Sequence, residues 1–265
     1  MDNLLTSICL VDASRRAQSW LCEDKRTTRR RSQEMTNTID FPVHTDVAEK
    51  LTDILSPGVV PCDAECADRA GSDQLNHEGS TTPYIALNSD EPGIRGLFKY
   101  RPETAFPLNG LVEVLLFREN SLTRGERELI ATYVSALNEC RFCFFTHAAI
   151  AAAHLPEGMT LVEQVRADLE AAPVSDKLRA LLAIAAAVQQ SGRRVSRQDI
   201  AAARAAGATD LEIHDTVLIA AAFCMYNRYV DGLGTLAAND PEHYAARAER
   251  TDGYLAVLAD SLSQG

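Results

Sequence analysis

The chain has 265 residues and a net charge of −11, and 46% of its residues are hydrophobic, which is enough for one sizeable core with or without a tail. An acidic chain argues against sequence-independent binding of nucleic acid, because such binding needs a cationic surface. Its longest apolar runs are broken by charged residues well before the ~20 residues that a bilayer requires, so we expect no membrane-spanning helix.

The first 34 residues differ from the rest in charge, because they carry seven Lys or Arg against five Asp or Glu. Their basic run RTTRRR, residues 26–31, favours a disordered tail, although it could also contact nucleic acid or anionic lipid. Met35 offers an alternative translation start, which would make residues 1–34 a misannotated start. The apolar run LLTSICLV precedes an Arg pair instead of following one, so it lacks the charge order of a secretion signal, and we expect a cytoplasmic protein.

Residues 35–82 show no sustained hydrophobic period and are interrupted repeatedly by proline and glycine, so we expect an irregular segment. Only DVAEKLTDIL, residues 46–55, has an amphipathic helical pattern. The CDAEC motif could form a second redox pair between Cys62 and Cys66, or a metal site with His77. Chance proximity in a flexible segment is the interpretation that we prefer.

Residues 83–260 change to helical periodicity, and most of the expected helices carry a start or a stop signal. The first runs over 101–117, where Pro and acidic residues precede an apolar pattern. The next begins after Thr123, whose side chain can cap the helix while Glu126 caps in return. Capping residues recur at Ser175, at Ser196 with Asp199, and at Thr209 with Glu212, predicting helices over 175–192, 196–207 and 209–232, and a last helix follows Pro241. Because strand-like alternation is nowhere sustained and Ala-rich runs recur, we predict an all-α fold.

The stretch NECRFCFFTH, residues 138–147, contains two cysteines and a histidine at helical spacing. Cys140 and Cys143 fall on one helix face at i and i+3, and His147 follows on the same face. With Asn138 as the N-cap, Cys140 would lie in the first helical turn, where N–H groups and the helix dipole stabilise a thiolate. A thiolate attacks peroxides, and a partner thiol within reach converts the sulfenic acid to a disulfide. His147 can hold or relay a proton near neutral pH.

Two other interpretations of this motif stay open. Buried cysteines are common in Ala-rich cores, so the pair could be inert packing. Two Cys and one His could also bind zinc, but they supply three ligands where a closed site needs four, and no further ligand motif follows. The odd total of seven cysteines does not indicate a disulfide framework. We therefore expect a redox-active pair and no metal.

The run ERELIATYVSALNECRFCFFTH resembles the alkylhydroperoxidase AhpD-like group of the carboxymuconolactone decarboxylase superfamily. The motif of that family, E-x(11)-C-x-x-C-x-x-x-H, falls on Glu128, Cys140, Cys143 and His147 with every spacing met. The later run FCMYNRYVDGLG resembles the closing helix of the family, so the resemblance covers about residues 83–258 and leaves out the N-terminal third.

The resemblance implies an AhpD-like helical domain over residues 83–260, with an N-terminal extension, that assembles as a trimer or hexamer and needs no cofactor. It implies that Cys140 and Cys143 face a buried cavity and cycle between dithiol and disulfide, with Cys143 attacking the peroxide and Cys140 resolving it. Glu128 and His147 would form a proton relay that lowers the thiol pKa. The helix-dipole argument instead favours Cys140 as the more thiolate-like group, and for the attacking thiol we follow the resemblance.

The chain departs from the family pattern between the two cysteines. The best-known members carry a His there, where this chain has Arg141 and Phe142. This departure resembles the less characterised peroxidase-related branch of the family, and it puts a lipoyl-type electron donor in doubt.

The position of Glu128 poses a geometric question. Twelve residues along one straight helix would turn Glu128 ~120° away from Cys140 and make it a surface charge. A break at Asn138 and Glu139 would instead give two helices and allow Glu128 to pack back toward the cysteine pair.

Four other residues of the last long helix are weaker candidates for the site. Cys224 lies in an apolar stretch and is expected in the core, and His214 is expected to be structural or on the surface. Asn227 and Asp231 could line the cavity, but a helix-terminal cap or an ion pair is the interpretation that we prefer.

The leading hypothesis for function is a thiol-dependent peroxidase that reduces a peroxide through Cys140 and Cys143, with a dithiol or protein reductant as its partner. A second is a decarboxylase or isomerase acting on a lactone or a related acid, but relatives of that kind lack the C-x-x-C pair. A third is a non-catalytic helical oligomer whose thiols sense oxidation, since sensing uses the same dithiol.

Overall fold

The computed structural model describes residues 74–248 and 252–256. The basic segment 1–34, the expected helix at 46–55 and the CDAEC motif therefore lie outside the described residues. The elements in chain order are β1 (Gln74–Leu75), α3 (Ile94–Tyr100), α4 (Pro102–Val112), the π-helical η3 (Glu113–Phe117), α5 (Arg124–Leu137), α6 (Arg141–His154), α7 (Gly158–Ala167), α8 (Asp176–Gln190), the 3₁₀-helical η4 (Gly192–Arg194), α9 (Arg197–Ala205), α10 (Asp210–Gly232), β2 (Ala237–Ala238) and α11 (Pro241–Ala248).

The predicted all-α fold is confirmed. In the described part of the chain the strands form only one short antiparallel pair, in which Gln74 faces Ala238 and Leu75 faces Ala237. The helix expected over 101–117 is present as α4 followed by η3. Within the described ranges, no helix combines the length and the apolar character needed to cross a bilayer.

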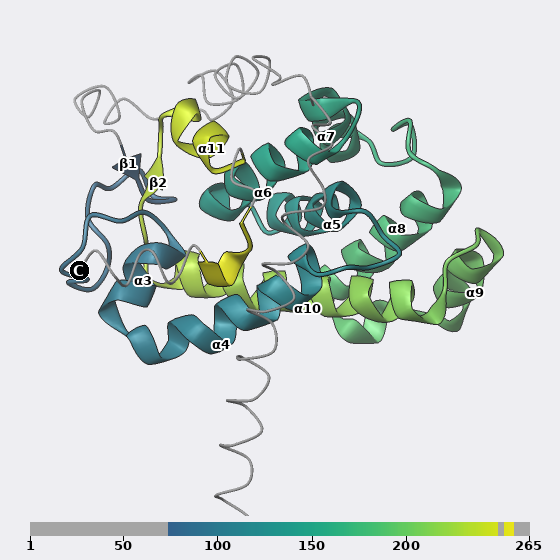
Figure 1. The fold of residues 1–265 in the computed structure, drawn as a ribbon, viewed down its shortest axis with the longest axis horizontal. Helices are drawn as coiled ribbons and strands as arrows, with labels where there is room; N and C mark the ends of the chain where they lie inside the picture. The colour runs from purple at the N-terminus through teal and green to yellow at the C-terminus, as the bar shows by residue number, and fades with distance from the viewer. Residues whose placement is uncertain (1–73, 249–251, 257–265) are drawn as a thin grey trace, which may run out of the picture. The chain divides into compact units, whose positions relative to one another are not determined.

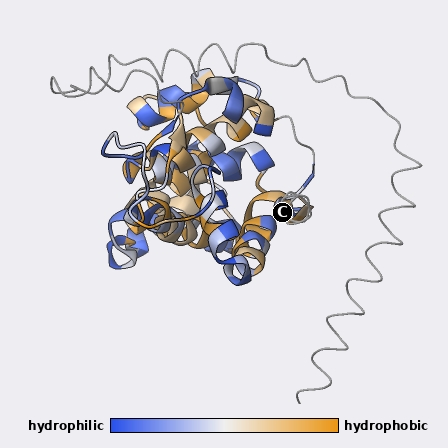
Figure 2. Cartoon of the chain, turned by 90° about the vertical axis from the view of Figure 1, so that its left-hand side faces the viewer, coloured by the Kyte–Doolittle hydropathy of each residue, from blue (hydrophilic) through white to orange (hydrophobic). Residues whose placement is uncertain are grey.

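Helix α6 lies at the centre of the helical packing. It contacts α5 most extensively and also packs against α7 and α11 (Figure 1). Its residues from Phe142 to Ala152 are all buried, as expected of a helix that is apolar on every side. Figure 2 shows the apolar segments gathered toward the middle of the helices and the hydrophilic ones on peripheral turns. The cysteine motif is therefore carried by an interior helix.

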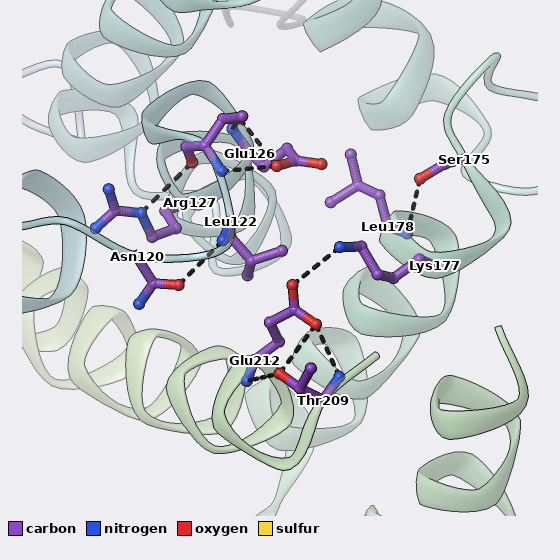
Figure 3. A network of polar contacts seen from close by, with 10 residues as sticks. Asn120, Leu122, Glu126, Arg127, Ser175, Lys177, Leu178, Thr209 and Glu212 are labelled. Carbon is purple, nitrogen blue, oxygen red and sulfur yellow. Dashed lines mark hydrogen bonds and ion pairs between the residues drawn. The ribbon is translucent and has the colours of Figure 1, made fainter. Parts of the chain in front are cut away.

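The predicted N-terminal caps are confirmed. Thr123 and Glu126 form a capping box at α5, and the same reciprocal bonds join Ser196 to Asp199 at α9. At α8, the Ser175 hydroxyl accepts the Leu178 N–H (Figure 3). These side chains satisfy N–H groups that a helix leaves without intrahelical partners, which explains why the helices begin where the sequence predicts.

Glu212 caps α10 and also joins α10 to α8. Its carboxylate accepts the Thr209 N–H at 2.7 Å and the Lys177 Nζ at 2.9 Å (Figure 3). Burial raises the pKa of Glu212, but the hydrogen bonds from Thr209 and Lys177 outweigh it and hold the pKa at about 2. The carboxylate therefore remains charged in the folded protein down to strongly acidic pH.

The prediction that Asn138 is the N-cap of the helix that carries the cysteines is wrong. Asn138 is the C-cap of α5, and α6 begins only at Arg141, with Cys140 as its N-cap. The reason is a Schellman turn: Glu139 has φ 58°, its N–H donates to Ala136, and the Cys140 N–H donates to Ser135. The break between two helices is thus confirmed, but the second helix starts later than predicted.

Glu212→Gln should destabilise the protein by about 1 kcal/mol at pH 7, because Gln retains the shape but not the charge that Lys177 and the helix N-terminus stabilise. The folded-state pKa is depressed, so the contribution is complete above about pH 4.5 and disappears as the pH falls toward about 2. Urea denaturation from pH 7 to pH 3 measures this difference. Asp210→Asn, which removes an exposed charge from the same helical turn, is the control. An equal pH dependence in both variants would contradict the assigned role.

Candidate functional site

The two cysteines occupy different positions at the start of α6. Cys140 is the N-cap and is fully buried, whereas Cys143 lies in the first helical turn and is 4% exposed. Both are free thiols. The N–H groups and the dipole of a helix favour negative charge at its N-cap and in its first turn, so the start of α6 places both cysteines where this effect can act.

Cys140 is held as a neutral thiol. Its Sγ–H donates to Asp231 Oδ1 at 3.3 Å, and its sulfur lies within hydrogen-bonding range of the Cys143 side chain. The hydrogen bond to Cys143 and burial raise the pKa of the Cys140 thiol far above its ordinary value. The expectation that the helix N-terminus makes Cys140 thiolate-like is not met, because the effect of the Cys143 backbone N–H is outweighed by the Cys143 side chain and by burial.

Glu128 and His147 face each other across α5 and α6. His147 Nδ1 lies 2.7 Å from Glu128 Oε2, and the Glu128 side chain is fully buried. A surface position, which the residue pattern alone predicted for Glu128, is wrong because the Schellman turn folds α6 back along α5. A carboxylate partner holds a proton on Nδ1, which leaves Nε2 of the neutral imidazole as a proton acceptor.

Tyr254 is a third member of this cluster that the sequence analysis missed. Its hydroxyl donates to Glu128 Oε1 at 2.7 Å, while Arg124 Nε approaches the same oxygen to 3.9 Å. Burial, followed by the charge of Glu128, raises the pKa of Tyr254 well above its ordinary value, so it stays protonated as a donor. Its segment is anchored by the Leu255 N–H, which donates to Glu113 of η3 at 3.3 Å. A buried carboxylate needs such partners.

A cavity of about 80 Å³ adjoins the cluster. Cys143 and His147 line it together with Thr146, whose buried hydroxyl has no hydrogen-bond partner among the described residues. The apolar part of its wall consists of Ile94, Phe98, Leu108, Val112, Phe142 and Phe223. Neither Cys140 nor Glu128 is part of the wall. The cavity thus exposes one thiol and one imidazole, and their partners lie behind them.

The remaining candidates of the last long helix lie away from the cavity. Asn227 is buried and links Asn138 to Ser135 by hydrogen bonds of 2.8 and 3.1 Å. Asp231 contacts Cys140, so neither residue lines the cavity. Cys224 is only partly buried, and His214 is exposed on the surface as expected. Among the residues that the structure describes, no group of three or more His, Cys, Asp or Glu could hold a metal ion.

Part of the chain is similar to one known protein family. Residues 156–238 match the model of the carboxymuconolactone decarboxylase family, so the match begins after the cysteine motif. The structure of an uncharacterized peroxidase-related protein from Ralstonia eutropha JMP134, described as an alkylhydroperoxidase AhpD core, is 27% identical with a TM-score of 0.54. The alignment covers 61% of this chain and 83% of that one.

A second solved structure is similar in fold. It is an uncharacterized peroxidase-related protein from Silicibacter sp. TM1040, with 20% identity and a TM-score of 0.53. The alignment covers 81% of this chain and 100% of that one. No curated protein matches the chain.

Tyr254→Phe should lower the free energy of unfolding by about 1–3 kcal/mol, because it leaves one oxygen of a buried carboxylate without its donor. Combined with Glu128→Gln, the loss should be less than additive, since both changes remove the same hydrogen bond. Denaturant unfolding of the single and double variants measures this coupling. Tyr100→Phe, at a position that is 54% exposed, serves as the control and should have no effect. Strictly additive losses would show that Tyr254 and Glu128 do not interact.

Proposed function

Since the chain is AhpD-like in sequence and fold, we propose that it is a thiol-dependent peroxidase that uses Cys140 and Cys143 in a dithiol/disulfide cycle. The observation that carries this proposal is the asymmetry of the pair. Cys143 lines a cavity together with His147, whereas Cys140 is buried behind it and hydrogen bonded to it. A nucleophilic thiol needs access to its substrate, and a resolving thiol needs access only to the first thiol.

In the first step Cys143 attacks the distal oxygen of a hydroperoxide. The thiol proton passes to His147 Nε2, the S–O bond forms as the O–O bond breaks, and the same proton then leaves with the alcohol. Cys143 and His147 are i and i+4 on α6, so both face the same end of the cavity. Cys143 is left as a sulfenic acid, and the peroxide has been reduced by two electrons.

The Glu128 carboxylate supports this proton transfer by its contact with His147. An imidazolium forms when His147 takes the thiol proton, and a carboxylate 2.7 Å from Nδ1 stabilises it. Burial strengthens the interaction, because no solvent screens a carboxylate that is fully buried. Tyr254 and Arg124 keep that carboxylate in place. The arrangement follows the general pattern of a nucleophile, a base and a group that orients the base.

In the second step Cys140 attacks the sulfur of Cys143 and releases water as the disulfide forms. A dithiol or protein reductant then supplies two electrons and two protons to restore both thiols. No metal or organic cofactor takes part in either step.

The cavity favours an organic hydroperoxide as the substrate. Most of its lining is apolar, with aromatic side chains from α3, α6 and α10. Near these, Glu91 pairs with Arg95 at 3.1 Å and with Lys99 at 3.5 Å. An apolar wall gains free energy by contacting the organic part of a hydroperoxide, a contribution that hydrogen peroxide cannot make.

Cys143→Ser should abolish turnover of cumene hydroperoxide with a dithiol donor, because it removes the nucleophile. Cys140→Ser should still consume one equivalent of peroxide, but it should stop at a sulfenic acid on Cys143. Coupled assays together with mass spectrometry of the oxidised protein measure both outcomes. Cys224→Ser provides the matched control, since it removes a free thiol that lies outside the cavity wall.

The proposal would be contradicted by a Cys143→Ser variant that remains as active as the wild type. Formation of the disulfide without any catalytic turnover would favour the redox sensor instead. Activity on a lactone or a related acid that survives both substitutions would favour the decarboxylase.

A further inference from the structure

Asp231 lies in the last turn of α10 and contacts the thiol that faces away from the cavity. Its Oδ1 accepts the Cys140 Sγ–H at 3.3 Å, and Cys140 is fully buried. His147, the base proposed for Cys143, is held by Glu128 on the cavity side. Cys140 therefore contacts a carboxylate, whereas Cys143 shares the cavity wall with His147.

Resolution of a sulfenic acid requires Cys140 to lose its proton, because the thiolate is the attacking species. In the reduced protein, the bond to Cys143 and burial raise the pKa of Cys140 above its ordinary value. Burial still acts when Cys143 is a sulfenic acid, so a proton acceptor in contact with Cys140 would assist its attack. The two residues between the cysteines, Arg141 and Phe142, supply no base. Among the described residues that hydrogen bond to Cys140, Asp231 alone is a carboxylate.

The position of Asp231 is unfavourable for helix stability. The C-terminal end of a helix carries a partial negative charge, so an acidic residue in the last turn of α10 is disfavoured by the dipole. In the described part of the chain, no Lys or Arg forms an ion pair with Asp231. Burial raises the pKa of the Asp231 carboxyl, which makes its carboxylate a better proton acceptor. The charge of His77 lowers the pKa of Asp231, but burial has the larger effect.

We propose that Asp231 is the catalytic base for the resolving step, a role that rests on the peroxidase cycle proposed above. The Cys140 proton passes to Asp231 Oδ1, and the Cys140 sulfur attacks the sulfenic sulfur of Cys143. The S–S bond forms as the S–O bond breaks, and the hydroxide leaves into the cavity, where solvent protonates it to water. Asp231 then returns its proton to solvent, so the step consumes one thiol and one sulfenic acid and releases one water.

The test separates the two steps of the cycle in the Asp231→Asn variant. The reduced protein is mixed with one equivalent of cumene hydroperoxide, and sulfenic acid is trapped with dimedone at set times. Oxidation of Cys143 should proceed at the wild-type rate, whereas disulfide formation should slow by at least ~10-fold. Dimedone-labelled Cys143 should therefore accumulate. Asp231→Glu should recover part of the rate, and Glu242→Gln, an exposed acidic position on α11, should behave as the wild type.

A second assay follows the same attack by Cys140 without using peroxide. The reagent 4,4′-dithiodipyridine reacts with Cys143 and releases one thiopyridone, and attack by Cys140 on the mixed disulfide releases the second. Asp231→Asn should slow only the second release. If the wild type reduces no peroxide while this second release still depends on Asp231, the proposed peroxidase function fails and the role of Asp231 as a base stands.

The proposal is overturned if Asp231→Asn forms the disulfide at the wild-type rate in both assays. It is also overturned if Asp231→Asn slows both thiopyridone releases equally, because Asp231 would then act on the structure of the whole site. Thermal unfolding of the reduced variants identifies a folding defect. Should Asp231→Asn not fold, the same two outcomes are read from Asp231→Glu, whose longer carboxylate should change the second release alone.

Discussion

The Schellman turn between α5 and α6 fixes the geometry of the site. Glu139 adopts a left-handed conformation, and the Cys140 N–H closes the turn on Ser135. This makes Cys140 the N-cap and places Cys143 in the first turn of α6. One residue more or less in the turn would rotate every side chain of α6 by about 100° and move Cys143 from the cavity wall. The turn also folds α6 against α5, which is what brings His147 to Glu128.

The turn divides the site into two sides with different proton chemistry. On the cavity side, Cys143 and His147 line the wall, and the buried carboxylate of Glu128 holds the imidazole. On the other side, Cys140 is sealed from solvent and bonded to Asp231 at the end of α10. In the proposed cycle, the thiol that meets the substrate and the thiol that meets only its neighbour are thereby held in contact. Their different positions relative to the cavity favour an ordered two-step cycle over two equivalent thiols.

Some of this arrangement was predictable from the sequence because the signals are local. The capping boxes at Thr123 and Thr209 identify helix starts through residues only three apart. The start of α6 was predicted two residues too early because Glu139, a residue that rarely adopts positive φ, occupies a position where glycine is usual. Tyr254 lies 126 residues from Glu128 in the chain, and no pattern in a single sequence connects them. The burial of Glu128 was indicated only by the family resemblance.

The central claim, that Glu128 and His147 serve proton transfer at Cys143, is tested most directly by the single-turnover rate of Cys143 oxidation in Glu128→Gln. Gln preserves the shape of the side chain but cannot stabilise an imidazolium as a carboxylate does, so the rate should fall by at least ~10-fold. Glu212→Gln, which removes a buried carboxylate far from the cavity wall, should lose stability without losing rate. An unchanged oxidation rate in folded Glu128→Gln would contradict the account and leave Glu128 with a purely structural role.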